Sequence, residues 1–255
     1  MVNVLFDGSF EGFLCVVYEF YYNKITPIVI QAEGQAQLTL FDDYYEVETD
    51  AERAKRVLNG ICTKISDEVA NTVHYAFLAD EYPDRFMTIL KYIQFGFKVG
   101  ANLTSYLAED CVRKVNDYAR ATGKESGLLH GFCRFAETDT GVFYCEITPK
   151  NDVLALLCPH FTQRLMNQAW IIHDKRRHIA AIYDTNDYII TPVPRDVTFT
   201  YAEGEKEIQE LWVTFFNSLA IEARKNKKLQ RQLLPLYYRK NMTEFKAYPS
   251  NGVAT

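Results

Sequence analysis

The sequence predicts an α+β protein that combines antiparallel hairpins with a central helical block and a long C-terminal helix. Apolar residues recur at the helical period over residues 50–120. Between residues 131 and 184, alternating segments around tight turns replace that period. A last helical stripe runs from Ile208 to Leu219. No internal repeat or low-complexity linker interrupts the chain, so we expect a single domain over residues 1–255.

The composition is that of a globular protein of 255 residues, with 48% hydrophobic and 24% charged residues. No segment reaches the roughly 18 apolar residues that a membrane helix needs, and the start of the chain lacks the basic region of a signal peptide. The six cysteines form no C-x-x-C pair, which predicts reduced thiols in a cytoplasmic protein. Because histidines and cysteines lack the spacing of zinc ligands, we expect no metal and no cofactor.

The chain opens with a strand, a turn and a capped helix. Residues 2–6 form a short, mostly apolar run, Asp7 and Gly8 indicate a turn, and Ser9 is placed as the N-cap of an amphipathic helix. A helix N-terminus can also receive an anion, but the spacing matches neither a Walker nor a Rossmann loop. Gly12 in the first turn suggests close packing.

Strands are predicted at residues 28–30 and 38–41, and a helical block follows. The spacing of Thr49 and Glu52 is that of a capping box, Ser66 is a second N-cap, and Gly100 ends a later helix. A further stripe over residues 103–115 predicts the next helix.

Two hairpins and one helix are predicted in the second half. The first hairpin covers residues 131–147 around Asp139, and the second covers residues 169–184. Between them, residues 152–168 read as a helix capped by Asp152. Cys133 and Cys145 are equidistant from Asp139 and could face each other, yet we predict free thiols because disulfides are rare in the cytoplasm.

The end of the chain is basic. Residues 224–246 hold eight Lys or Arg against the single acid Glu244, whereas the whole chain has a net charge of −5. The apolar stripe before this segment is expected to dock on the core, and the segment itself to project into water until Pro235 stops it. A basic segment on an acidic body indicates a polyanionic partner; a solvated helix face is the simpler alternative.

Residues 160–177 gather the polar side chains that could carry chemistry. His160, Arg164 and Gln168 are spaced to share one helix face, with Trp170 packed beneath. Histidine can act as an acid or base and arginine can clamp a phosphate, while Asp174 could orient a histidine. The alternative is a polar helix face over a buried tryptophan.

Several motifs resemble a bacterial family described as probable DNA metabolism or DNA-repair proteins, built on a domain of unknown function. The opening stretch matches over residues 6–14, including Asp7, Ser9 and Glu11. A G-F-x-R-F strand contains Arg134, and an H-F-x-x-R-F-x-x-Q-x-W motif contains His160, Phe161, Arg164, Gln168 and Trp170, with Leu165 in place of an aromatic residue. A D-x-x-R pair, Asp174 and Arg177, and a tail around residues 234–239 complete the match, although the tail lacks the family's tryptophan and the basic residue after the proline.

The resemblance implies a DNA-binding protein that acts with a radical S-adenosylmethionine protein. In that family the domain also occurs fused to a uracil-DNA glycosylase-like module, which likewise implies a role in DNA metabolism. The candidate nucleic-acid-binding residues are Gln168, Lys175, Arg176, Arg177, Lys227, Lys228, Arg231, Tyr237, Tyr238 and Arg239. A groove between the basic turn and the basic tail would hold the nucleic-acid strand. Two alternatives remain: an enzyme in its own right with His160, Arg164 and Asp174 as catalytic residues, or a protein-interaction scaffold.

Overall fold

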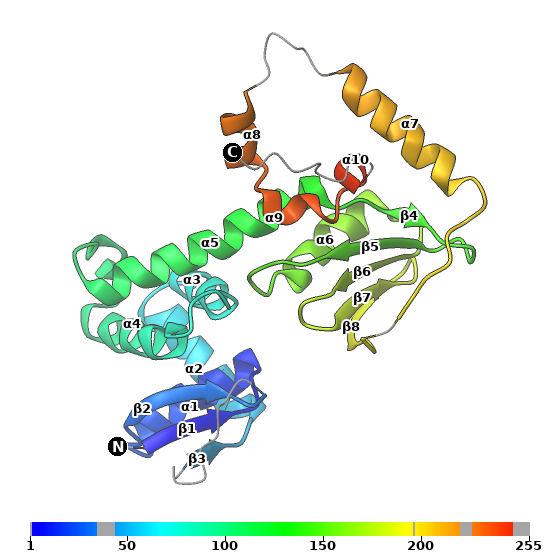
Figure 1. Ribbon diagram of the computed structural model, residues 1–255. Coiled ribbons are helices and arrows are strands. Elements are labelled where there is room, and N and C mark those ends of the chain that lie inside the picture. Colours follow the sequence, from blue (N-terminus) through cyan, green and yellow to red (C-terminus); the bar gives the residue numbers. More distant parts are fainter. Residues whose placement is uncertain (1, 35–43, 196, 220–225, 247–255) are drawn as a thin grey trace. The chain divides into compact units, whose positions relative to one another are not determined.

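The computed structural model describes residues 2–34, 44–195, 197–219 and 226–246 (Figure 1). Helices and two separate sheets make up the described chain, which confirms the α+β fold class. By its internal contacts the chain divides into two compact units, Met1–Lys124 and Glu125–Thr255. This division does not test whether the chain folds as one domain, which stays a prediction.

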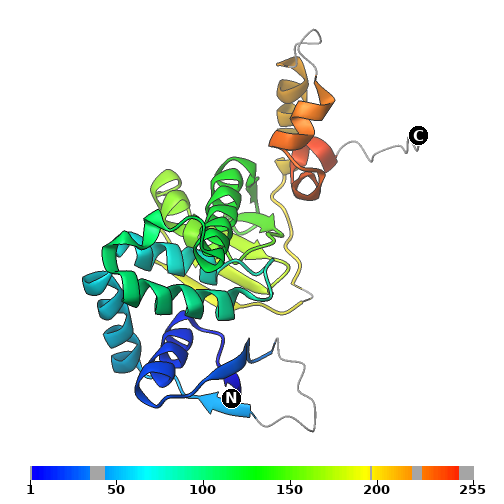
Figure 2. The ribbon, with the colours of Figure 1, turned by 90° about the vertical axis from the view of Figure 1, so that its left-hand side faces the viewer.

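The first unit contains a small parallel sheet. Its strands are β1 (Val2–Phe6), β2 (Pro27–Ala32) and β3 (Tyr44–Val47), in the order β2-β1-β3. Helix α1 (Phe10–Tyr22) connects β1 to β2, as parallel neighbours require a crossover. Figure 2 shows this blue helix beside the sheet. The strand predicted at residues 38–41 lies outside the described residues.

The predicted helical block follows β3. Its helices are α2 (Ala51–Lys64), α3 (Asp67–Phe77), α4 (Arg85–Val99), the 3-10 helix η1 (Gly100–Ser105) and α5 (Asp110–Phe132), which runs into the second unit. Ser66 caps α3 and Gly100 ends α4, as predicted. The cap of α2 is Asp50 and not Thr49, because the Thr49 hydroxyl donates to Asp7 instead, at 2.7 Å. The helix predicted over residues 103–115 is interrupted between η1 and α5.

The second unit contains a five-stranded sheet in the order β4-β5-β6-β7-β8. The strands are β4 (Ala136–Glu137), β5 (Phe143–Ile147), β6 (Trp170–Asp174), β7 (Ile179–Tyr183) and β8 (Tyr188–Pro192). Both predicted hairpins are present, as the antiparallel pairs β4–β5 and β6–β7. Helix α6 (Leu154–Arg164) joins β5 to β6, which are parallel. Trp170 is fully buried against α6 and stacks on Tyr183 at 5.3 Å between ring centroids.

The first hairpin is shorter than predicted because α5 continues to Phe132. Ala136 pairs with Tyr144, so the turn is centred on Thr140 and not on Asp139. Cys133 therefore follows the last turn of α5, where its amide donates to the carbonyl of Leu129, and does not face Cys145 across a ladder. The two thiols are nevertheless neighbours, since contact with the Cys145 thiol raises the pKa of Cys133. Both cysteines are free, as predicted.

Short helices complete the second unit. They are α7 (Glu205–Ser218), α8 (Lys227–Leu233), α9 (Leu236–Arg239) and α10 (Thr243–Lys246). Asn226 caps α8 as a separate helix, and Pro235 follows its end, as predicted. In the described residues no helix is both long and apolar enough to cross a membrane.

The expectation that the apolar stripe of α7 docks on the core is wrong. Leu211, Phe215 and Leu219 are 69%, 52% and 63% exposed. Two hydrogen bonds tie α7 to the rest of the unit: the indole of Trp212 donates to Glu244 of α10 at 3.1 Å, and the amide of Glu137 donates to Glu205 at 3.1 Å. Apart from the packing of Phe216 on Phe245, with ring centroids 5.7 Å apart, polar contacts hold α7, and most of the predicted apolar stripe is exposed.

Candidate functional site

The opening motif forms a closed network of hydrogen bonds. One carboxylate oxygen of Asp7 accepts from both the amide of Ser9, at 2.9 Å, and its hydroxyl, at 2.7 Å; the other accepts from Thr49. Ser9 in turn accepts from the amide of Gly12 and caps α1. Burial opposes ionisation of Asp7, but these hydrogen bonds outweigh it and lower its pKa. The Asp7 carboxylate thus occupies the position at the start of α1 where an external anion could bind. Glu11 is exposed in the first turn of the same helix.

Gly12 is needed for this network. A Cβ atom at this position would meet the Asp7 carboxylate and lie 2.8 Å from the Thr49 hydroxyl oxygen. We expect Gly12→Ala to destabilise the protein by about 1–3 kcal/mol, because the introduced methyl group displaces both side chains. Gly127, in α5, has no heavy atom within 4 Å of its virtual Cβ, so Gly127→Ala is the matched control and should be neutral or stabilising. Urea unfolding of both variants checks this; equal stabilities would contradict it.

His160 lies on α6 and stacks on a histidine from α5. The ring centroids of His130 and His160 are 4.3 Å apart with an interplanar angle of 20°. In the described structure the buried Nε2 atom of each ring has no hydrogen-bond partner. Burial and the neighbouring His160 lower the pKa of His130. His130 was not among the predicted site residues, because it lies between the predicted helical block, which ends at residue 120, and the predicted hairpin, which begins at residue 131.

The predicted helical face of His160, Arg164 and Gln168 does not form. Helix α6 ends at Arg164 with Leu165 as its C-cap, so Gln168 lies in the following turn. Arg164 and Gln168 are both exposed. The N-cap is also shifted: it is Val153 and not Asp152. Helical spacing alone could not reveal that α6 stops one turn before Gln168.

Asp174 orients a turn and not a histidine. Its side chain is fully buried, and it accepts from the amides of Arg176 at 2.9 Å and Arg177 at 3.2 Å. Its second oxygen accepts from the Arg177 guanidinium at 2.8 Å. The neighbouring His173 instead bonds the Tyr144 hydroxyl through Nδ1, at 2.8 Å. The described contacts therefore do not join His160, Arg164 and Asp174 into one site.

The basic turn between β6 and β7 uses its cations within the unit. Lys175 pairs with Glu146 at 3.2 Å. The guanidinium groups of Arg176 and Arg177 donate to the carbonyl of Lys150, at 2.9 and 3.0 Å, and so hold the loop after β5. These contacts within the unit give the cations of the turn a structural role. They therefore weaken the expectation that the turn contacts phosphates.

The cations of α8 are arranged differently. Lys227, Lys228 and Arg231 are all exposed, and α8 buries no residue, as predicted for this segment (Figure 1). Within the described ranges none of the three forms a salt bridge. Arg224 and Lys225 lie outside the described residues.

The aromatic residues after α8 divide into one exposed and one buried. Tyr237 is 37% exposed, and the ammonium group of Lys240 lies 4.7 Å from its ring centroid. Tyr238 is buried and its hydroxyl donates to Glu125 at 2.6 Å, which corrects the expectation that it stacks on bases. Arg239 packs over Phe245 at 4.7 Å and donates to the carbonyl of Leu234.

Arg134 belongs to a partly buried polar cluster that is centred on the buried Glu244 carboxylate. Its guanidinium group makes two hydrogen bonds with the Glu244 carboxylate, at 2.6 and 3.1 Å. It also lies 5.2 Å from the centroid of the Trp212 ring. Among the described residues no group of three or more His, Cys, Asp or Glu is placed to hold a metal ion.

The family model of DUF4130, a domain of unknown function, matches residues 83–244. The chain belongs to the DUF4130 family. The matched region contains the stacked histidines, the basic turn and α8, whereas the opening motif precedes it. Membership therefore supports a shared fold over this region and assigns no reaction.

Two further comparisons add little to this assignment. No curated protein matches the chain. A solved structure, the pGpG-specific phosphodiesterase PggH from Vibrio cholerae, is similar at a TM-score of 0.36 and 8% identity, over 86% of this chain and 99% of that one. A likeness at that level carries no argument about the DUF4130 chain.

Proposed function

We propose that the protein binds DNA through the cationic helix α8 and acts in DNA metabolism beside a radical S-adenosylmethionine protein. One observation carries the proposal: Lys227, Lys228 and Arg231 are exposed, and none forms a salt bridge with a described acid. Unpaired cations on a short exposed helix are available to phosphates, and each contact releases counterions. Tyr237, exposed shortly after α8, adds a ring on which a base can stack.

Other cations contribute less in this proposal. Lys175, Arg176 and Arg177 are engaged with Glu146 and with the carbonyl of Lys150. A groove between that turn and α8 stays a prediction. The exposed apolar face of α7 supports contact with a protein partner, for which the radical protein of the family resemblance is our candidate. The alternative of an independent enzyme has less support, since Asp174 is committed to its turn.

Charge reversal of α8 tests the proposal. We expect the triple variant Lys227→Glu, Lys228→Glu and Arg231→Glu to weaken binding of fluorescein-labelled DNA by about tenfold or more, because three phosphate contacts become repulsive. Anisotropy titrations at several salt concentrations should show the slope of log affinity against log salt reduced by about 2. Since α8 buries no residue, the melting temperature should change little.

A charge-matched control separates local contacts from the overall field. Lys55, Lys91 and Lys124 are exposed in the first unit, and their reversal to Glu changes the net charge by the same amount. That variant should bind more tightly than the α8 variant. The proposal fails if DNA binding survives reversal of α8, does not depend on salt, or is absent at low salt.

A further inference from the structure

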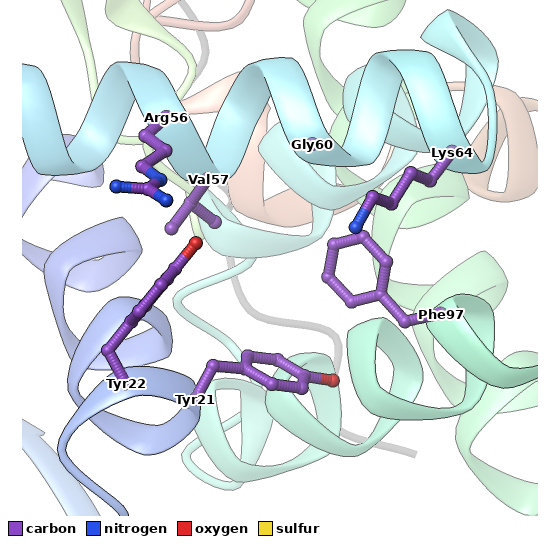
Figure 3. Close-up of a pocket in the computed structure, with 7 residues that line it drawn as sticks. All are labelled: Tyr21, Tyr22, Arg56, Val57, Gly60, Lys64 and Phe97. Atoms are coloured by element: carbon purple, nitrogen blue, oxygen red, sulfur yellow. The ribbon is translucent and has the colours of Figure 1, made fainter.

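The first unit contains an open cavity of about 340 Å³ between α1, α2 and α4 (Figure 3). Its lining combines Tyr21 and Tyr22 from α1, Arg56, Gly60 and Lys64 from α2, and Phe97 from α4. Small-molecule sites commonly begin at about 300 Å³ and combine apolar walls with a few polar groups. The cavity has both properties and lies outside the region matched by the DUF4130 model, apart from Phe97.

Aromatic rings form one side of this cavity. The rings of Tyr21 and Phe97 meet edge to face, with centroids 5.4 Å apart and an interplanar angle of 89°. Tyr22 stacks on Tyr18 at 4.3 Å, and 49% of its surface is exposed. Figure 3 shows Tyr21, Tyr22 and Phe97 directed into the space below α2. Such rings accept a planar base by stacking.

Two cations lie above these rings. The Arg56 guanidinium is 4.7 Å from the centroid of the Tyr22 ring, and the Lys64 ammonium is 5.8 Å from that of Phe97. Both side chains are exposed, and no salt bridge in the described part of the chain neutralises either of them. They stand about 12 Å apart along α2, at opposite ends of the cavity. The site is therefore positive at both ends and aromatic between them.

Gly60 keeps the middle of the cavity open. It lies between Arg56 and Lys64 on α2, and a Cβ atom there would lie 3.7 Å from the Phe97 ring. A methyl group would touch the ring, and a larger side chain would occupy the space between the two cations. A residue with poor helix propensity in the interior of α2 is thus placed where the cavity needs room.

We propose that this cavity binds a nucleotide, with the base held against the aromatic side formed by Tyr21, Tyr22 and Phe97 and the phosphate held by Arg56 or Lys64. Arginine and lysine bind phosphate through charge-assisted hydrogen bonds, and the rings supply the contact that a bare anion cannot use. The nucleotide is either free or one unit of a nucleic-acid strand. The proposal goes beyond DNA binding by α8, because this site lies in the other unit and can be tested on its own.

Isothermal titration calorimetry of the full chain separates the possible ligands. The titrants are the four nucleoside monophosphates, adenosine, inorganic phosphate and a short oligothymidylate. We expect at least one nucleotide to bind about tenfold or more tightly than adenosine and phosphate, because only the nucleotide uses rings and cations together. Binding of monophosphates indicates a free nucleotide as ligand, whereas binding of the oligothymidylate alone indicates a strand.

Variants locate the binding. Arg56→Glu and Lys64→Glu should each weaken it by about tenfold, which corresponds to about 1.4 kcal/mol, and Gly60→Leu should abolish it. Lys55→Glu, on the same helix but outside the cavity, is the charge-matched control and should bind like the wild type. Circular dichroism melts confirm that each variant is folded, and Arg56→Gln replaces Arg56→Glu if the latter is not.

Three results would overturn the proposal: no binding of any nucleotide or oligonucleotide, phosphate bound as tightly as nucleotides, or wild-type binding by both charge variants and Gly60→Leu. The α8 triple variant should bind free nucleotide normally. Failure at this cavity is therefore distinguishable from failure of DNA binding by α8.

Discussion

Glu125→Gln should lower the free energy of unfolding by about 3–5 kcal/mol, the largest effect that we expect of a single substitution in this chain. Glu125 is buried, and its carboxyl oxygens accept four hydrogen bonds. Two come from the amides of Lys150 and Asn151, at 2.7 and 2.9 Å. The others come from the Asn151 side chain at 2.8 Å and the Tyr238 hydroxyl at 2.6 Å.

The amide group of glutamine cannot replace this carboxyl group. One of its ends is a donor, so it faces donors that have lost their acceptor in a buried place. Glu125 also joins three elements, since Asn151 lies in the loop before α6 and Tyr238 lies on α9. The same loop accepts hydrogen bonds from Arg176 and Arg177 through the carbonyl of Lys150. Loss of Glu125 should therefore loosen both the basic turn and the segment after α8.

Urea unfolding followed by circular dichroism measures the effect. Tyr238→Phe removes a single donor and should cost about 1–2 kcal/mol, while Glu203→Gln on the exposed surface should stay within about 0.5 kcal/mol of the wild type. A loss below 1 kcal/mol for Glu125→Gln would mean that the four hydrogen bonds contribute no more than an ordinary pair.

Features fixed by short stretches of sequence could be predicted. The Ser9 cap, the hairpins and the stop of α8 before Pro235 depend on neighbouring residues, and the structure contains all of them. The exposure of α8 also followed from cations on several of its faces. Local chemistry decides such features, because capping and turn formation involve residues within a few positions.

Contacts between distant residues account for several of the wrong predictions. Tyr238 is 113 positions from Glu125, and no local pattern marks its hydroxyl as a buried donor. The stripe of α7 has the period of a docked helix, yet Trp212 meets a carboxylate 32 positions away and most of the stripe stays exposed. The candidate nucleotide cavity was also missed, because its residues come from three helices and share no motif.

The second large effect is expected at Glu244, whose carboxylate holds the ends of the second unit together. It is buried, pairs with Arg134 at 2.6 Å over a separation of 110 positions, and accepts from the Trp212 indole. We expect Glu244→Gln to lower the free energy of unfolding by about 3 kcal/mol at pH 7, because the Arg134 guanidinium loses a buried bidentate partner. Glu207→Gln, exposed on α7, is the matched control and should be neutral.

The pH dependence of this effect separates an ionic contact from packing. Burial raises the pKa of Glu244, but hydrogen bonds from Arg134 and Trp212 outweigh burial, and the net result is a lowered pKa. A carboxyl group with a lower pKa in the folded state stabilises the protein above its unfolded pKa, about 4.3 for glutamate. That contribution is lost as the pH falls through the folded pKa. The difference between wild type and Glu244→Gln in urea unfolding should thus be constant from pH 7 to about pH 5 and shrink below about pH 4.3. If the difference stays the same at low pH, packing and not an ionic contact holds α7 and α10 to Arg134. The ionic explanation for this arginine of the family motif is then wrong.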